Sequence, residues 1–252
     1  MIDLSVLYCG LETPSTPHRY GRKITQIDPP EHQRMAVARS AAERRPIVVW
    51  NITRTCNLKC VHCYTDSEAK RYPDELTTDQ AKAVLDDLAE FQVPAVLFSG
   101  GEPLVRPDLF ELAEYARGLG LHVVLSTNGT LIDADRARRF VELGFAYIGI
   151  SLDSARPEVH DRFRGMEGAF QRTMSGFRAC VDAGQKVGLR LTLTRQTCND
   201  LNEIFQFIER EGIDSACFYH LCPAGRGSAL FDAINETETP RFVREAFSAF
   251  MV

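Results

Sequence analysis

Residues 52–64 read ITRTCNLKCVHCY and set Cys56, Cys60 and Cys63 in a C-x3-C-x2-C spacing that Tyr64 follows directly. Three closely spaced thiolates can hold three irons of a 4Fe–4S cluster, whereas an electron-transfer cluster of this type takes four cysteines. The fourth iron is then open, and an open metal position is what separates catalytic metal sites from structural ones. The spacing therefore predicts a 4Fe–4S cluster with one iron free for chemistry.

A structural zinc site is the main competing interpretation of these cysteines. Zinc takes four tetrahedral ligands, and His62 stands too close to Cys60 and Cys63 in the sequence to be a comfortable fourth. A disulfide framework is disfavoured, because the 8 cysteines are spread over 252 residues and we find no signal peptide. No apolar stretch is long enough to span a membrane.

Length and composition are those of one soluble globular domain. A hydrophobic content of 44% and a charged content of 25% are ordinary for such a domain, and 252 residues can bury a sizeable core. The formal net charge is −5 with no block of like charge, which gives no support for binding to nucleic acid or to an anionic membrane. Because reduced thiols and clusters belong to a reducing compartment, we expect a cytoplasmic protein.

Beyond residue 45, apolar β-branched runs alternate with segments of helical spacing. Prolines break residues 1–30 and a short polar helix is expected over 31–44, so residues 1–45 are expected to form an irregular N-terminal arm. Strands are expected at 47–53, 95–99, 121–127, 145–152, 186–194 and 215–221, and helices at 78–91, 107–119, 133–143, 169–183 and 201–211. The predicted fold class is therefore α/β, a parallel sheet in a partial (β/α)6 barrel.

The residues that could carry chemistry follow the ends of these predicted strands. The cysteines follow the first strand, residues 99–103 (SGGEP) the second and residues 126–129 (STNG) the third. Ser151 closes the fourth strand, and His220 and Cys222 close the sixth. In β/α barrels the C-terminal ends of the strands carry the active site. The sequence therefore predicts one site at this end of the sheet.

Gly100 and Gly101 stand before Glu102 in the GGEP run. Glycines let the backbone approach a ligand closely and adopt positive φ, although a GGEP run by itself fits a plain turn. Together with C-x3-C-x2-C one strand earlier, it resembles the motif pair of the radical S-adenosylmethionine (radical SAM) enzymes. The resemblance covers about residues 47–227 and implies a radical SAM barrel over 46–227, with a 4Fe–4S cluster and SAM as cofactors.

The resemblance also implies contacts to SAM. The Gly100–Glu102 run would hold the amino group of the methionine moiety, and the backbone of Tyr64 would lie beside the adenine. Asn128 would lie on the ribose side. Ser151 and Arg162 would hold the methionine carboxylate, which a guanidinium can bind in bidentate fashion. The alternatives are a buried strand-end hydroxyl for Ser151 and a surface ion pair for Arg162.

Residues 50–54 (WNITR) and 217–227 (CFYHLCPAGRG) resemble the tetrapyrrole-modifying branch of the family, and within it the enzymes of haem d1 biosynthesis. This implies a siroheme-type substrate, 12,18-didecarboxysiroheme, whose propionate side chains are removed by a 5′-deoxyadenosyl radical made from SAM. It also implies an electron donor such as flavodoxin or ferredoxin. A haem-pathway decarboxylase, a peptide-modifying maturase and a non-catalytic Fe–S protein remain alternatives.

Further polar residues have weaker assignments. His220 and Cys222 could contact substrate, and Arg190, Arg195 and Arg226 could neutralise an acidic one, with solvated charges as the alternative. The remaining thiols are expected to be inert: Cys9, Cys180, Cys198 and Cys217.

The C-terminal end is expected to differ from that of related enzymes. Enzymes of this branch usually carry a C-terminal segment with cysteines for a second cluster, whereas no cysteine follows Cys222 before Val252. Residues 228–252 are therefore expected to be the start of a shortened extension.

Overall fold

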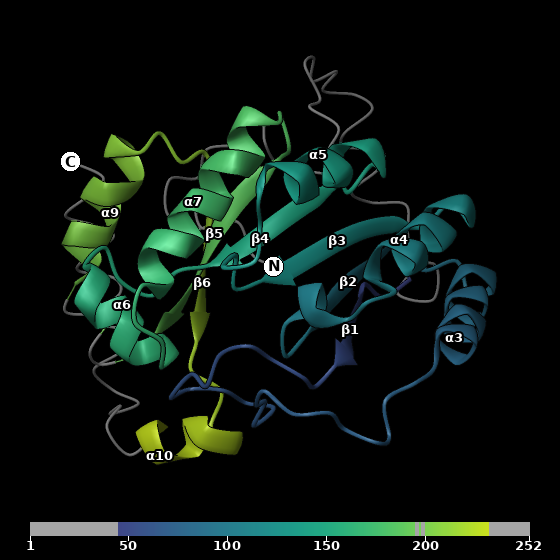
Figure 1. Cartoon of the computed structure of the whole chain (residues 1–252), viewed down its shortest axis with the longest axis horizontal. Helices are drawn as coiled ribbons and strands as arrows, with labels where there is room; N and C mark the ends of the chain where they lie inside the picture. Colours follow the sequence, from purple (N-terminus) through teal and green to yellow (C-terminus); the bar gives the residue numbers. More distant parts are fainter. Residues whose placement is uncertain (1–44, 195–196, 198–199, 232–252) are drawn as a thin grey trace, which may run out of the picture.

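A six-stranded parallel sheet organises the computed structural model, which describes residues 45–194, 197 and 200–231 (Figure 1). The strands lie side by side in sequence order: β1 (Val48–Thr53), β2 (Ala95–Gly100), β3 (His122–Thr127), β4 (Tyr147–Ser151), β5 (Val187–Leu193) and β6 (Ala216–His220). Each neighbouring pair is parallel, and β1 and β6 are the two edges of the described sheet. The predicted open, partial barrel is confirmed.

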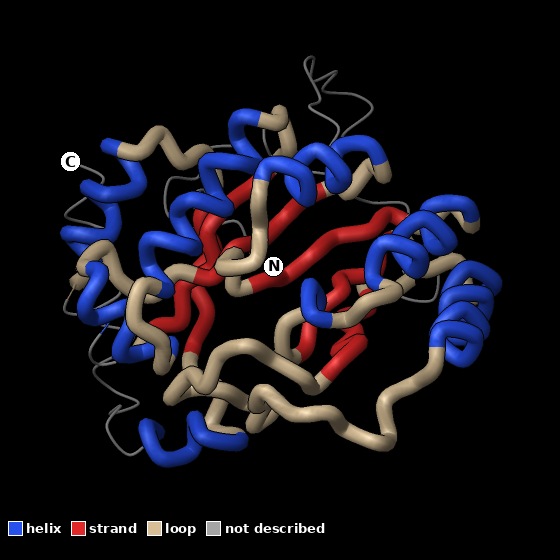
Figure 2. The backbone as a smooth tube through the Cα atoms, in the orientation of Figure 1, coloured by secondary structure: helices blue, strands red, loops and turns tan. Residues whose placement is uncertain are grey.

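Helices connect most of the strands and form an arc along one side of the sheet (Figure 1). They are α3 (Thr78–Glu90), α4 (Leu109–Gly118), α5 (Ala134–Glu142), α6 (Pro157–Arg164), α7 (Ala169–Asp182) and α9 (Leu201–Arg210), with the 3-10 turn η2 (Pro103–Val105). The 3-10 turn η3 (Gly225–Gly227) and the short α10 (Ser228–Phe231) follow β6, and α10 lies apart from this arc (Figure 1). None of these described helices has the length and apolar character that crossing a bilayer requires. Figure 2 shows the connection from β1 to α3 as a long loop.

The helix predicted at 107–119 begins two residues later than expected, at Leu109. Asp108 precedes it but makes no side-chain cap, because its carboxylate accepts hydrogen bonds from Arg106 and from the Thr78 hydroxyl at 2.7 Å. Pro107 therefore lies in the turn before the helix. In addition, α6 was not predicted at all, and it carries residues that matter for the site below.

The core lies between the helices and one face of the sheet, and strand alternation leaves the other face more open. In β3, Val123 and Leu125 are buried in the core whereas Val124 and Ser126 are half-buried on the opposite side. We call this opposite side the inner face; it carries Asn51, Ser99, Ser126, Ser151, Arg190 and Tyr219, all of them at least partly exposed. The inner face therefore has room for a ligand that the helix-covered face lacks.

Several expectations fall outside the described residues. They are the arm and helix over 1–44, most of the extension over 228–252, and Cys9, Arg195 and Cys198.

Candidate cluster and cofactor site

The three cysteines of the motif lie together in the loop after β1, which we call the cysteine loop (residues 54–67). Cys56 and Cys60 are buried in a small cluster against which Cys63 and Met166 pack. Within the described residues, no three His, Cys, Asp or Glu side chains converge closely enough to share a single metal ion. Three soft sulfur donors on one short loop are the ligand chemistry that an iron–sulfur cluster requires, so the residues fit that group.

The surroundings shift the pKa values of the Cys56 and Cys63 thiols in opposite directions. Burial raises the pKa of the Cys56 thiol to about 12. Burial would also raise the pKa of Cys63, but hydrogen bonds from the Thr65 hydroxyl and the Ser67 backbone N–H hold it below its ordinary value. Since only the thiolate binds metal, Cys63 is the thiol best prepared to do so.

Arg226, which follows β6, fastens the cysteine loop from the far edge of the sheet. Its Nε donates to the Cys60 carbonyl oxygen at 2.8 Å, and its backbone N–H donates to the Cys63 carbonyl oxygen at 3.0 Å. Its Nη2 donates to the Ser67 carbonyl oxygen at 2.9 Å. The guanidinium predicted as a possible substrate contact is thus occupied by the loop. Although β1 and β6 do not pair, the segments after them are joined.

Gly100 and Gly101 bring the end of β2 against the start of the cysteine loop. The backbone N–H of Gly101 donates to the Thr53 carbonyl oxygen at 2.8 Å. A Cβ on Gly100 would overlap that oxygen, and one on Gly101 would overlap the Thr55 carbonyl oxygen. Gly100 also has φ of +120°, which side chains rarely tolerate. The two glycines therefore allow the end of β2 to pack against the segment that follows β1, which is a structural role independent of any ligand contact.

Glu102 is fully buried and joins the ends of β2 and β3. Its carboxylate accepts from the Leu104 N–H at 3.0 Å, the Thr127 hydroxyl at 2.8 Å and the Asn128 N–H at 2.7 Å. Burial raises the pKa of this carboxyl despite these donors. Because its oxygens are engaged by the protein, the predicted contact of this run to the SAM amino group would come from backbone carbonyl oxygens.

The side chain of Asn128 reaches the cysteine loop. Its Nδ2 donates to Asn57 Oδ1 at 2.9 Å, and its Oδ1 accepts from the Thr130 N–H at 2.9 Å. Asn57 in turn donates to the Thr130 hydroxyl at 2.9 Å. The structure thus brings Cys56–Cys63, Glu102 and Asn128 together, as strand-end placement predicts. The ribose contact of Asn128 stays a prediction.

Tyr64 is partly exposed, and its hydroxyl donates to Asn51 Oδ1 at 2.9 Å. Ser151 is half-buried at the end of β4, where its Cα pairs in register with that of Arg190 on β5. The phenol of Tyr64 therefore turns toward β1, which leaves its backbone for the predicted adenine contact.

The other cysteines and His220 differ in exposure. Cys222 and His220 are exposed, Cys217 is half-buried and Cys180 is buried.

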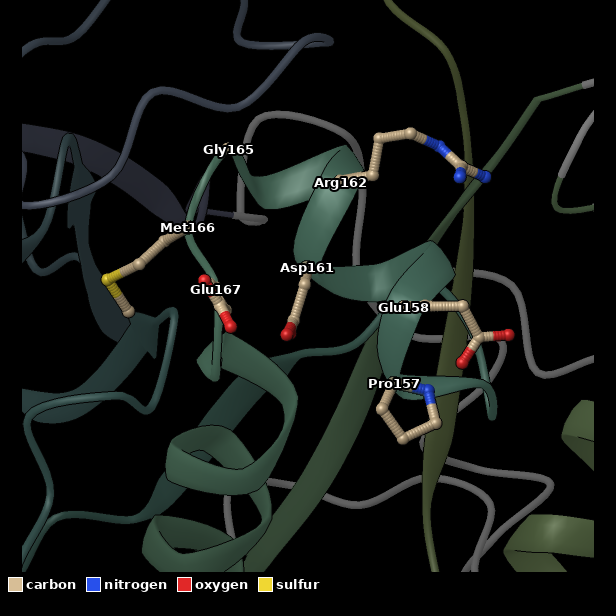
Figure 3. Close-up of a pocket in the computed structure, with 7 residues that line it drawn as sticks. All are labelled: Pro157, Glu158, Asp161, Arg162, Gly165, Met166 and Glu167. Atoms are coloured by element: carbon tan, nitrogen blue, oxygen red, sulfur yellow. The ribbon is translucent and has the colours of Figure 1, made fainter.

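Arg162 lies on the exposed side of α6, beside a recess of about 590 Å³ that the helix and the turn after it form. Figure 3 shows its side chain extending away from Asp161, Met166 and Glu167. Within the described residues, no hydrogen bond or ion pair joins Arg162 to the cysteine loop; the arginine of this helix that reaches a cysteine is Arg164. Its predicted role toward the SAM carboxylate stays a prediction without a supporting contact.

Arg164, two residues further along α6, is the arginine that reaches the cysteines. It is buried, pairs with Asp153 Oδ2 at 2.6 Å and places Nη1 3.8 Å from Cys60 Sγ. Asp153 is also buried; burial would raise its pKa, but Arg164 and nearby His62 and His160 hold it below its ordinary value. This pair is not evident from the sequence, because the pattern of residues 157–164 does not predict a helix and so does not indicate which arginine points inward.

Two histidines, half-buried His62 and buried His160, complete the surroundings of Arg164. His160 Nδ1 accepts from the Asp153 backbone N–H at 3.3 Å, and His62 stacks on Phe163 with ring centroids 4.5 Å apart. Burial lowers the pKa of both histidines to about 4, so both are neutral at physiological pH. Arg164 is therefore the positive charge beside Cys60.

Comparisons with known proteins agree with this arrangement. The family model described as Radical SAM superfamily matches residues 50–208. The chain is 49% identical over 230 residues to the Fe-coproporphyrin III synthase of Methanosarcina barkeri, covering 91% of this chain and 56% of that protein. It is 48% identical over 184 residues to the pre-heme d1 synthase of Dinoroseobacter shibae, covering 73% of this chain and 45% of that protein. The chain thus spans about half the length of these curated relatives.

The fold also has a solved counterpart. Streptococcus suis SuiB bound to S-adenosylmethionine superposes with a TM-score of 0.69 at 16% identity, covering 81% of this chain and 47% of that one. At this identity the likeness concerns the fold, and it agrees with the partial barrel.

Proposed function

Because the chain belongs to the radical SAM superfamily, we propose that it modifies a tetrapyrrole of a haem pathway by radical chemistry. The cofactors of the family are a 4Fe–4S cluster and SAM, which together supply a 5′-deoxyadenosyl radical that abstracts hydrogen from the substrate. Cys56, Cys60 and Cys63 would hold the cluster. The observation that carries the proposal is the cysteine loop, fastened by Arg226 beside Glu102 and Asn128 at the C-terminal ends of the strands.

The residues of this chain would orient the cofactors and keep water out. Arg164 lies beside Cys60. Among the described residues, it is the charged side chain that donates a hydrogen bond to a sulfur of the three cysteines. Burial of Cys56 and Cys60 excludes water from two of the three ligands. SAM would lie against the inner face, with Ser151 at its carboxylate, the Gly100–Glu102 backbone at its amino group and the Tyr64 backbone at its adenine.

The finer proposal is a reaction of haem d1 biosynthesis, in which propionate side chains are removed from 12,18-didecarboxysiroheme. Likeness to a pre-heme d1 synthase supports it. Likeness to an Fe-coproporphyrin III synthase supports a second product, iron coproporphyrin III, and therefore a second candidate reaction. We further propose that residues 46–227 form the catalytic core, that flavodoxin or ferredoxin is the electron donor, and that the protein works in the cytoplasm.

The test is anaerobic reconstitution followed by measurement of 5′-deoxyadenosine, with dithionite and SAM, in the presence and absence of 12,18-didecarboxysiroheme. Product that rises with the tetrapyrrole is the expected result, and mass spectrometry of the tetrapyrrole separates pre-haem d1 from iron coproporphyrin III. If SAM is cleaved equally with and without the tetrapyrrole, the proposed cofactors stand and the proposed substrate is wrong. An intact cluster without any cleavage would overturn the enzymatic proposal.

A further inference from the structure

Arg190 is a cation on the inner face whose side chain is held in one place by its neighbours. It lies on β5, and its Cα pairs in register with Ser151 of β4 and with Cys217 of β6. A Cβ on Gly149 would overlap the Arg190 side chain, so the glycine makes room for the arginine to lie across β4. The guanidinium carbon stands 4.8 Å from the centroid of the Tyr219 ring. Arg190 is therefore fixed between two strands.

The positive charge of Arg190 has no acidic partner within the described residues. Arg106, Arg156 and Arg164 each pair with an aspartate at 2.7 Å or less. No carboxylate of the described chain lies within ion-pair distance of Arg190, although its side chain is half-buried. Partial burial of an unpaired charge is unfavourable, which makes this position one where an anion from outside would be bound.

The geometry favours a planar, carboxylate-bearing ligand. A guanidinium presents parallel N–H donors that match the two oxygens of a carboxylate, and stacking on an aromatic ring fixes the plane of those donors. Tyr219 supplies such a ring at the edge strand β6, on the open side of the sheet. A carboxylate that approaches along the inner face would therefore meet a guanidinium whose plane the Tyr219 ring already fixes.

We propose that Arg190, oriented by Tyr219, binds a carboxylate side chain of the tetrapyrrole substrate. This inference rests on the proposed function, since it names the contact that the same site makes to that substrate. The SAM carboxylate is the competing anion, because Ser151 lies beside Arg190. The substrate is favoured because the guanidinium stacks over the ring of Tyr219, a residue of the edge strand β6, whereas the charge beside Cys60 is that of Arg164.

The experiment compares Arg190→Gln, Arg190→Lys and Arg138→Gln with the wild-type protein, each reconstituted with its cluster. Arg138→Gln is the matched control, because Arg138 is exposed on α5 and pairs only with Asp135 among the described residues. Absorbance titration gives the Kd for 12,18-didecarboxysiroheme and for iron coproporphyrin III, and equilibrium dialysis gives the Kd for SAM. Iron content and circular dichroism check folding.

Arg190→Gln is expected to raise the tetrapyrrole Kd about tenfold or more and to leave the SAM Kd unchanged, as loss of a charged hydrogen-bonded pair predicts. Arg190→Lys, which keeps the charge without the planar fork, should fall between wild type and Arg190→Gln, and it decides the question if the glutamine variant does not fold. Arg138→Gln should behave as wild type.

Three results would overturn the inference. An unchanged tetrapyrrole Kd in both Arg190 variants, with tight binding by the wild type, removes this contact and leaves the proposed function standing. A weakened SAM Kd with unchanged tetrapyrrole binding assigns Arg190 to the cofactor instead. Wild-type protein that binds neither tetrapyrrole overturns the proposed function, and the inference with it.

Discussion

The two faces of the same sheet have opposite characters, and adjacent residues of one strand show it. In β2, Phe98 is fully buried beneath the helices and packs edge-on against Trp50, whereas Ser99 is half-buried on the inner face. The helix-covered face is mainly apolar, but the inner face carries hydroxyl, amide and guanidinium groups. Alternation along each strand thus separates the residues that hold the fold from those that can bind a ligand.

The largest difference is expected between two buried cysteines, Cys60 in the cysteine loop and Cys180 in the core on the helix-covered side of the sheet. Cys60→Ala removes a proposed cluster ligand, so reconstituted protein should hold no stable cluster. Cys180→Ala is the matched control, since Cys180 is fully buried in α7 under the helix layer. It should keep its iron and lose about 1 kcal/mol of unfolding free energy. Iron analysis and ultraviolet–visible spectra measure both, and a full iron complement in Cys60→Ala would refute the ligand assignment.

Neighbours on opposite faces of β2 should differ in stability. Phe98→Ala leaves a cavity in the core and should lower the free energy of unfolding by about 3–5 kcal/mol. Ser99→Ala should change it by less than about 0.5 kcal/mol, because the side chain is half-exposed. Urea denaturation of both apoproteins provides the measurement. Equal losses in the two variants would show that the inner face is packed as tightly as the core.

Arg226 tests whether the cysteine loop depends on the segment after β6. Arg226→Gln removes the hydrogen bonds from the guanidinium to the Cys60 and Ser67 carbonyl oxygens. Loss of such outer contacts typically weakens metal binding, so we expect iron to be lost to a chelator about tenfold faster. Arg138→Gln, an exposed arginine on α5, is the control. Equal rates of iron loss would mean that the loop holds its shape without Arg226.

Much of the fold could be predicted because the strands and most helices have clear periodicity and glycine stops. Leu112, Ala113 and Ala116 give α4 its buried side, and Leu119 and Gly120 end it. The stretch that forms α6 has fewer apolar positions, Val159 and Phe163, and several charges, so its pattern does not distinguish a helix from a loop. The position of the candidate residues at the strand ends followed from the topology, and the structure has them there, whereas their roles stay predictions.

The arginine of α6 could not be chosen from the sequence for a related reason. Residues two apart on a helix point to nearly opposite sides, so Arg162 and Arg164 cannot both face the cysteines. Which one does depends on the packing of α6, where Val159 and Phe163 turn inward with Arg164. Likewise, the role of Glu102 as a link to Thr127 and Asn128 depends on contacts between strands that the sequence does not specify.

The smallest effect is expected at Tyr64 of the cysteine loop, whose hydroxyl donates to Asn51 on the inner face. Tyr64→Phe removes one hydrogen bond, to Asn51, between two exposed side chains, which should cost about 0.5 kcal/mol. The SAM Kd should stay within about twofold, because the predicted adenine contact is made by the backbone. Ser151→Ala is the contrasting variant, since loss of the proposed donor to the SAM carboxylate should raise that Kd about tenfold. Equilibrium dialysis with SAM compares the two. A loss of SAM affinity in Tyr64→Phe as large as that in Ser151→Ala would place the phenol in the SAM site, and the inner face would then extend over the cysteine loop.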